Sequence, residues 1–330
     1  MAEITRDLEP TGEPNAWYQG VIKELARQLL SDQEECVIFL GAGAAFDASK
    51  KHLPTGKMLS QSLAKECHLE WHEYIPLSTI AFYYEFYFKR KALNRTLKDA
   101  IADPSIEPST TIEKLMAIID TLEKHGRDVL VITTNYDQHF ERAYERRFGR
   151  PPGVIIYNGG TDANDKKAAL HVGLSKDPRA WRPRSAQTYL YKMHGCISAA
   201  EDRNLVVTEE DYINFLSNSS SYDPDKSLLQ YVLGKISDSS VLFIGYSLTD
   251  WNFRVIFKAT AEKHAKSGYA VQYYTADPMK SYEMIGWRAL VEFWGQKNVD
   301  IINVDAALFV EDLATVLREL ASTSTLKEVK

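Results

Sequence analysis

Two glycines follow the first apolar run of the sequence, where a backbone could approach a ligand closely. The run CVIFL (36–40) is followed by Gly41, Ala42 and Gly43. Glycines after a strand let backbone N–H groups approach a phosphate, and the N-terminus of the next helix favours negative charge. The dinucleotide fingerprint GxGxxG is incomplete, because Phe46 stands at the third glycine position. A tight strand-to-helix turn without a ligand is the alternative interpretation.

A polar segment follows a second apolar run, VLVIT (129–133). Its side chains Thr134, Asn135 and Asp137 can together hydrogen-bond a ribose or a carboxamide. Asn and Asp are also preferred N-cap residues, so Asn135 or Asp137 could instead cap the helix that follows. The segment therefore predicts polar ligand contacts, a helix cap, or both.

A histidine follows a third apolar run and directly precedes a glycine. His194 comes after YLYKM (189–193), where an exposed imidazole beside a flexible residue can act as an acid or a base. A fourth run ends at Gly245, which is followed closely by Ser247. Ligands of open α/β sheets bind at the carboxyl ends of the strands. We therefore expect these run ends to form one site.

Short apolar runs alternate with helical patterns along the chain. Such runs are typical of strands that are buried on both faces of a parallel sheet. They are 36–40, 129–133, 189–193, 241–245, 270–275 and 299–304. The helical patterns cover 16–30, 111–124, 138–147, 226–236, 250–263, 280–294 and 309–320. The alternation predicts an α/β fold with a Rossmann-like, doubly wound parallel sheet.

Two stretches interrupt this alternation. Residues 57–110 lack a strand pattern, and we expect them to form a helical insertion within a single domain spanning 1–330. The aromatic run FYYEFYFKR (82–90) inside it is either a binding surface or the packing surface between helices or subunits. Residues 158–186 are rich in Gly, Asn, Lys, Arg and Pro, which predicts a long connection, either a solvated loop or a lid.

Composition and charge exclude several classes of protein. The net charge is −6, with 39 Lys and Arg against 45 Asp and Glu, so direct nucleic-acid binding is not expected. No apolar run approaches the ~20 residues that span a bilayer, and the N-terminus does not resemble a secretion signal. The cysteines Cys36, Cys67 and Cys196 form no CxxC pair. We therefore expect no membrane association and a cytoplasmic location.

The order of the motifs resembles the sirtuin (silent information regulator) superfamily. GAG, TTNYD, KMHG, GYSL and a final IINVD follow one another between about residues 37 and 320, and sirtuins surround NAD with loops of this kind. The resemblance implies that NAD is the substrate and that Asn135 and His194 are catalytic. The residues that it places around NAD are Gly41, Ala42 and Gly43 at the pyrophosphate, Thr134 and Asp137 near the nicotinamide ribose, and Gly245, Ser247 and Asn303 at the adenosine half.

The sequence also departs from the sirtuin deacylases. They carry a zinc module with two CxxC pairs, which three cysteines cannot supply, so we expect no zinc module. His68, His72 and Glu73 lie close together but lack the HExxH order and a third ligand, so no metal is expected. The sequence is more similar to bacterial sirtuin-like proteins of antiphage defence, which share TTNYD, KMHG and GYSLTDxN.

That similarity implies hydrolysis of NAD to nicotinamide and ADP-ribose during phage infection. An NAD-dependent protein deacylase, or a non-catalytic subunit that binds NAD or ADP-ribose, are the alternatives. Uncontrolled NAD loss would harm the host cell, so we expect the activity to be gated by a homo-oligomer or by a partner protein that acts as sensor. In this family the partner is a HerA-like ATPase or a nucleotide-handling subunit. The candidate contact surfaces are residues 82–90 and 179–184.

Overall fold

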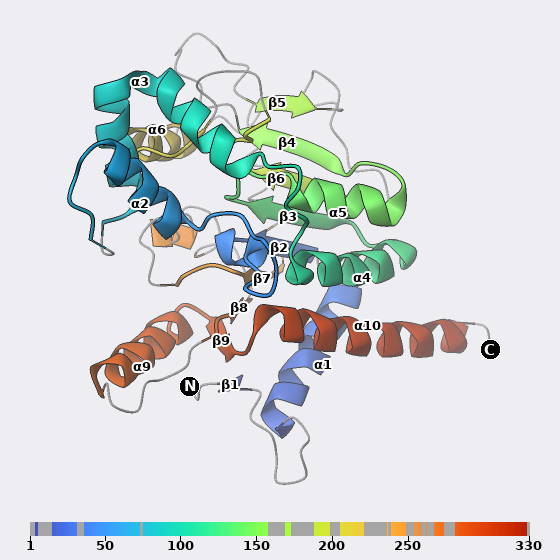
Figure 1. Ribbon diagram of the computed structural model, residues 1–330. Helices are drawn as coiled ribbons and strands as arrows, with labels where there is room; N and C mark the ends of the chain where they lie inside the picture. Colours follow the sequence, from blue (N-terminus) through green and yellow to red (C-terminus); the bar gives the residue numbers. More distant parts are fainter. Residues whose placement is uncertain are drawn as a thin grey trace.

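The computed structural model contains a nine-stranded sheet (Figure 1). It describes residues 4–5, 15–31, 36–72, 75–157, 169–172, 188–198, 205–220, 236, 239–248, 254–255, 257–258, 262, 267–273 and 281–328. The strands are β1 (Ile4–Thr5), β2 (Cys36–Leu40), β3 (Val129–Thr133), β4 (Gly153–Tyr157), β5 (Ala169–Val172), β6 (Thr188–Lys192), β7 (Ser240–Ile244), β8 (Ser267–Val271) and β9 (Val299–Asn303). Their order is β1-β9-β8-β7-β2-β3-β6-β4-β5, and all neighbours are parallel except β4 and β5.

Helices connect and cover these strands. They are α1 (Ala16–Leu30), α2 (Gly56–Glu66), α3 (Leu77–Ile101), α4 (Thr110–Lys124), α5 (His139–Phe148), α6 (Glu209–Ser220), α9 (Ser281–Gly295) and α10 (Ala306–Glu328). Local sequence signals set several ends: the Ser109 hydroxyl caps α4 by accepting from the Ile112 amide, and α5 ends at Gly149 with φ of 66°. No helix in the described part of the chain is long and apolar enough to cross a bilayer.

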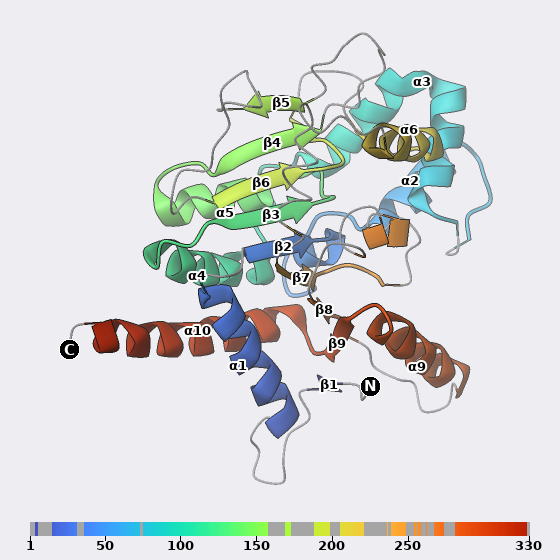
Figure 2. The same ribbon diagram turned by 180° about the vertical axis from the view of Figure 1, so that it is seen from behind.

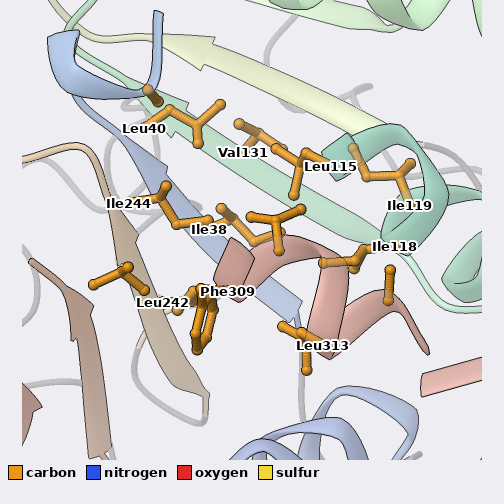
Figure 3. Close-up of a cluster of buried hydrophobic side chains, with 14 of the residues drawn as sticks. Ile38, Leu40, Leu115, Ile118, Ile119, Val131, Leu242, Ile244, Phe309 and Leu313 are labelled. Atoms are coloured by element: carbon orange, nitrogen blue, oxygen red, sulfur yellow. The ribbon is translucent and has the colours of Figure 1, made fainter. Parts of the chain in front are cut away.

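The central strands bury both of their faces. On one face, strand side chains pack against α4 and α10, and Figure 3 labels Ile38, Leu40, Val131, Leu242, Ile244, Leu115, Ile118, Ile119, Phe309 and Leu313 of this core. On the other face, Val37, Phe39 and Phe243 pack with Phe215 of α6 and Trp294 of α9. Side chains of consecutive strand residues alternate between the two cores, as the pleat requires. The predicted doubly wound parallel sheet is therefore confirmed.

Residues 57–110 contribute α2, α3 and the start of α4. Helices α2 and α3 share a third hydrophobic core that includes Leu63, Tyr84 and Leu97, together with Leu205 and Val207 from the segment before α6. Figures 1 and 2 show α2, α3 and α6 together at one end of the molecule. Helix α3 is kinked at Lys89, whose φ is 74°.

The sequence-based prediction missed three of the strands, β1, β4 and β5. The continuous run VIIY within β4 carried the same signal as the other buried strands. The prediction of a long connection over 158–186 did not include a strand, and residues 169–172 form β5, which pairs antiparallel with β4 at the sheet edge. Most of the helical patterns at 226–236 and 250–263 lie outside the described residues, as do Glu73 and residues 179–184.

Candidate functional site

A cavity of about 1080 Å³ lies at the carboxyl ends of the central strands. The ends meet because the strands are in register: Leu40 lies beside Thr133 and Ile244, and Thr133 beside Lys192. After β2 the chain continues to β3, which lies on one side of β2 in the sheet. After β7, which lies on the other side of β2, the chain continues outward to β8 and then β9. The cavity at the ends of these strands therefore lies at a topological switch point. Its volume slightly exceeds the range of about 300–1,000 Å³ for small-molecule sites and is large enough for a dinucleotide.

Glycines join the loops after β2 and β7 by close backbone contact. The amide of Gly41 donates to the Ile244 carbonyl at 2.9 Å, and the amide of Gly43 donates to the Gly245 carbonyl at 2.8 Å. A Cβ at Gly41 would lie 2.5 Å from the Gly245 carbonyl oxygen. The two glycines are therefore required by the approach of one loop to the other, and their amides are engaged within the protein rather than directed at a ligand.

Gly245 is the least replaceable residue of this contact. Its φ is +75°, and a Cβ there would lie 2.0 Å from the backbone nitrogen of Ala44. We expect Gly245→Ala to lower the free energy of unfolding by at least about 2 kcal/mol, because backbone strain adds to a collision with main chain that cannot yield. Urea titration followed by circular dichroism measures this. Gly20→Ala is the matched control, since nothing lies within 4 Å of a Cβ in that α1 position and alanine favours the helix. Equal stability of Gly245→Ala and the wild type would contradict the assignment.

Asn135 is held at the cavity wall by one hydrogen bond from its side chain and one from its backbone. Its Nδ2 donates to the Gly41 carbonyl at 3.1 Å, and its backbone N–H donates to the Thr133 hydroxyl at 3.0 Å. This arrangement uses the donor side of the amide and leaves Oδ1 as the acceptor. The neighbouring Thr134 hydroxyl donates to the Tyr246 hydroxyl at 3.3 Å.

Asp137 contacts the start of α5, but the N-cap residue of that helix is Gln138, so the prediction that Asn135 or Asp137 is the N-cap is wrong. Its Oδ1 accepts from the amide of His139 at 2.8 Å, at the start of α5. Its carbonyl accepts a short hydrogen bond from the buried Lys192 ammonium, which also pairs with Glu141 at 2.9 Å. Burial alone would lower the pKa of Lys192, but the Glu141 carboxylate beside it raises that pKa. Lys192 thereby ties both the loop after β3 and the first turn of α5 to β6, two residues before His194.

The His194 side chain is only 3% exposed, although an exposed imidazole was expected from its place beside Gly195. It packs edge-on against Tyr212 and Phe215 of α6, with ring centroids 5.1 and 5.7 Å away. Burial lowers the pKa of His194 to about 3, more than the distant charge of Asp211 raises it. The imidazole is therefore neutral at physiological pH, and its Nε2 has no hydrogen-bond partner in the described part of the chain.

Helix α6, which covers His194, is held by the insertion. Arg90 of α3 donates to Asp211 at 2.7 Å and to the Leu205 carbonyl at 2.6 Å. The same Asp211 carboxylate accepts from the amides of Val207 and Thr208 at the start of α6. The kinked helix of the insertion therefore positions the aromatic side chains that enclose the histidine.

Eight of the ten predicted site residues line this one cavity. They are Ala42, Gly43, Thr134, Asn135, Asp137, His194, Gly245 and Ser247. The structure does not place Gly41 or Asn303 in its wall: Gly41 accepts a hydrogen bond from Asn135, and the residues that follow β9, Val304 and Asp305, line the cavity instead.

Sequence reasoning missed other residues of the wall. Tyr246, Gln272 and Tyr273 also follow strand ends, and the strand-end rule could have found them. Lys57 and Leu77 come from the insertion, and no local signal points to their place in the wall. Among the residues that the structure describes, no group of three or more His, Cys, Asp or Glu side chains could hold a metal ion.

Comparison with known proteins identifies one family. A family model described as a SIR2-like domain matches residues 129–302, which contain the strands from β3 to β9. A solved structure described as "Structural Basis for the Mechanism and Regulation of Sir2 Enzymes" is 15% identical in sequence. The match covers 91% of this chain and 98% of the chain in that structure, with a TM-score of 0.42. An ADP-ribose complex of a mutant Sir2 homologue is 12% identical in sequence. That match covers 91% of this chain and 97% of the homologue's chain, with a TM-score of 0.44. No curated protein matches.

Proposed function

We propose, on the premise that this chain belongs to the SIR2-like domain family, that it hydrolyses NAD to nicotinamide and ADP-ribose. The observation that carries the proposal is that Asn135 and His194, far apart in the sequence, both line one cavity at the ends of neighbouring strands. A cavity of this size at a topological switch point suits a dinucleotide substrate.

The reaction breaks the bond between nicotinamide and ribose. The transition state has oxocarbenium character, with positive charge developing on the ribose, and departure of nicotinamide neutralises a cationic ring. In this proposal the acceptor oxygen Oδ1 of Asn135 holds the ribose or the attacking water. His194 is the general base, acting on water directly or through a ribose hydroxyl. Burial keeps its imidazole neutral, the form that accepts a proton, and also makes it a weaker base than an exposed histidine.

The remaining wall residues are assigned to the rest of the substrate. Ala42 and Gly43 would lie beside the pyrophosphate, and Gly245 and Ser247 beside the adenosine half, because these loops meet on one side of the cavity. Thr134 and Asp137 would border the nicotinamide ribose. Gly41 and Asn303 do not line the cavity, and Gly41 would act on the site through its hydrogen bond to Asn135.

Product analysis separates this proposal from its alternatives. Purified protein, supplied with its activating partner where one exists, should release nicotinamide and ADP-ribose in equal amounts from NAD without an acylated peptide, as measured by liquid chromatography. A deacylase would consume NAD only with an acylated lysine peptide and would yield an O-acyl-ADP-ribose. A non-catalytic subunit would bind NAD in calorimetry without turnover, with or without co-expressed partner. Either of the last two results would overturn the hydrolase proposal.

The biological setting is a further part of the proposal. The resemblance in TTNYD, KMHG and GYSLTDxN supports a role in antiphage defence, in which the cytoplasmic NAD pool is depleted under control of an oligomer or of a partner such as a HerA-like ATPase or a nucleotide-handling subunit. Bacteria that express the chain with its partner should lose NAD after infection and restrict phage. Cells that express a His194 variant should keep their NAD, and equal protection by that variant would exclude NAD depletion as the cause.

A further inference from the structure

One end of the cavity is formed by residues that follow β8 and β9. They are Val271, Gln272, Tyr273, Val304, Asp305, Ala306 and Ala307. In the sheet order, β7 with Gly245 lies between these strands and β3 with Asn135. Neighbouring strands are about 4.8 Å apart, so β9 lies roughly 19 Å from β3, a distance that an extended dinucleotide spans. The inference below rests on the proposed function: with the reacting bond at Asn135 and the adenosine half beyond Gly245, the adenosine ribose lies toward β8 and β9.

Asp305 caps the first turn of α10, the helix into which β9 leads (Figure 1). Its Oδ1 accepts from the amides of Ala307 and Leu308 at 2.9 and 3.1 Å, and its carbonyl accepts from the Phe309 amide at 2.9 Å. Backbone amides at the start of a helix, together with the helix dipole, otherwise bind anions such as phosphate. At the start of α10 the carboxylate of Asp305 already fills that position, so a second anion there would meet a negative charge.

We propose that Asp305 makes the site specific for NAD and excludes NADP. The two nucleotides differ by one phosphate, which NADP carries on the 2′-hydroxyl of its adenosine ribose. Because Oδ1 of Asp305 takes both amide bonds, Oδ2 is the oxygen that accepts from the 2′-hydroxyl of NAD. The same carboxylate repels the 2′-phosphate of NADP. In dinucleotide-binding folds an acidic side chain on the 2′-hydroxyl selects NAD in this way, whereas an arginine accommodates NADP.

The other charged side chains of the cavity wall do not offset Asp305. Among the residues that the structure describes, Lys57 is the one lysine or arginine that lines the cavity. It belongs to the first turn of α2 in the insertion, where its Nζ lies 5.8 Å from the centroid of the Trp71 ring. Asp47 and Asp137, which also line the cavity, are acidic. The described part of the wall therefore offers no cation to a 2′-phosphate beside β9.

Asp305→Asn separates the charge of this residue from its capping role. Asparagine caps a helix as well as aspartate does, so α10 keeps its start while the negative charge is lost. For the wild type we expect kcat/KM to be at least about 30-fold higher for NAD than for NADP, because like charges in contact repel each other. In Asp305→Asn the kcat/KM for NADP should rise about tenfold, whereas that for NAD should change less than about threefold. Initial rates of nicotinamide release from each nucleotide measure both values.

Asp305→Gly tests the amides that the carboxylate covers. Glycine is also an acceptable N-cap residue, but it leaves the amides of Ala307 and Leu308 open to a ligand. The kcat/KM for NADP should therefore rise further, to about 30-fold above the wild-type value, because the start of α10 can then bind the 2′-phosphate. Glu311→Gln is the matched control, since it removes one exposed negative charge from the same helix outside the cavity. In that variant the ratio of the two kcat/KM values should stay within about twofold of the wild type.

Binding measurements keep the role of Asp305 separate from the hydrolysis of NAD. In calorimetry the wild type should bind ADP-ribose more tightly than 2′-phospho-ADP-ribose, and both Asp305 variants should lose this preference, whether or not NAD is turned over. If the preference is found but neither nucleotide is hydrolysed, the hydrolase proposal fails and the role of Asp305 stands.

Four results would overturn the role of Asp305 and leave NAD hydrolysis in place. They are equal kcat/KM for NAD and NADP in the wild type, a wild type that binds neither ribose compound, a preference that persists in both Asp305 variants, and a Glu311→Gln control that shifts as far as those variants.

Discussion

Replacing His194 with phenylalanine is expected to lower kcat for NAD hydrolysis by about 10²–10⁴-fold, the usual contribution of a general acid or base. Phenylalanine keeps a planar ring against Tyr212 and Phe215, so the cluster under α6 remains filled. Alanine would leave a cavity beside these rings and confound a catalytic defect with a folding defect. The rate loss in the phenylalanine variant therefore reports the missing imidazole nitrogen rather than lost packing.

Steady-state kinetics with chromatographic detection of nicotinamide measures this effect. KM should change little, because the imidazole is assigned to the chemical step. His125→Phe is the matched control, since His125 caps α4 and does not line the cavity. A His194→Phe enzyme that retains more than a tenth of the wild-type kcat would exclude His194 as the general base.

The buried imidazole also gives a prediction for stability against pH. The pKa of His194 is lowered to about 3 in the folded chain, against an ordinary value near 6.5, because burial disfavours the charged form. Between these values the unfolded chain binds the proton and the folded chain does not, so protonation favours unfolding as the pH falls. Protonation of His194 should therefore lower the free energy of unfolding by about 1.4 kcal/mol for each pH unit between about 6.5 and about 3.

His194→Phe lacks this proton-binding group, which allows the term to be isolated. As the pH is lowered from 7 to 4.5, the free energy of unfolding should fall more for the wild type than for the variant. Urea titrations at both pH values measure it, and other titrating groups cancel in the difference. A difference independent of pH would show that the imidazole is not buried as a neutral group.

The sequence predicted the central strands because a parallel strand that is buried on both faces needs a continuous apolar run, as in CVIFL and VLVIT. It also predicted which strand ends carry polar groups, and Thr134, Asn135 and His194 do line one cavity. What local patterns do not contain is the pairing order. The contact between Gly43 and Gly245, loops about 200 residues apart, depends on β7 lying next to β2.

The burial of His194 was not predictable for the same reason. Its position before Gly195 indicated a turn, and turns are usually exposed. The side chains that enclose it come from α6, which follows in the chain but is held in place by Arg90 of the insertion. The strand end therefore predicted His194 as a site residue, whereas the burial of His194 depends on α6, a helix that carries no sequence motif.

Replacing Asn135 with alanine is expected to lower kcat by about 10²–10³-fold, the loss seen when one preorganised polar group is removed from a transition state. The side-chain amide is preorganised because its Nδ2 donates to the Gly41 carbonyl, while the backbone N–H of the same residue donates to the Thr133 hydroxyl. Thr133→Val should give a smaller loss, about tenfold, since it removes the hydrogen bond to the Asn135 backbone but keeps the amide itself.

Asn135→Asp tests the direction of the amide. Aspartate has the size of asparagine but no donor, so its carboxylate would face the Gly41 carbonyl that now accepts from Nδ2 at 3.1 Å. Repulsion between two acceptors should turn the side chain away, and kcat should fall as far as in the alanine variant although an acceptor oxygen is still present. Calorimetry with ADP-ribose should give affinities within about threefold of the wild type for both variants, because the amide is assigned to the reacting ribose and water rather than to overall binding. Full activity in Asn135→Asp would show that the hydrogen bond to Gly41 does not position the amide, and full activity in Asn135→Ala would remove this residue from the mechanism.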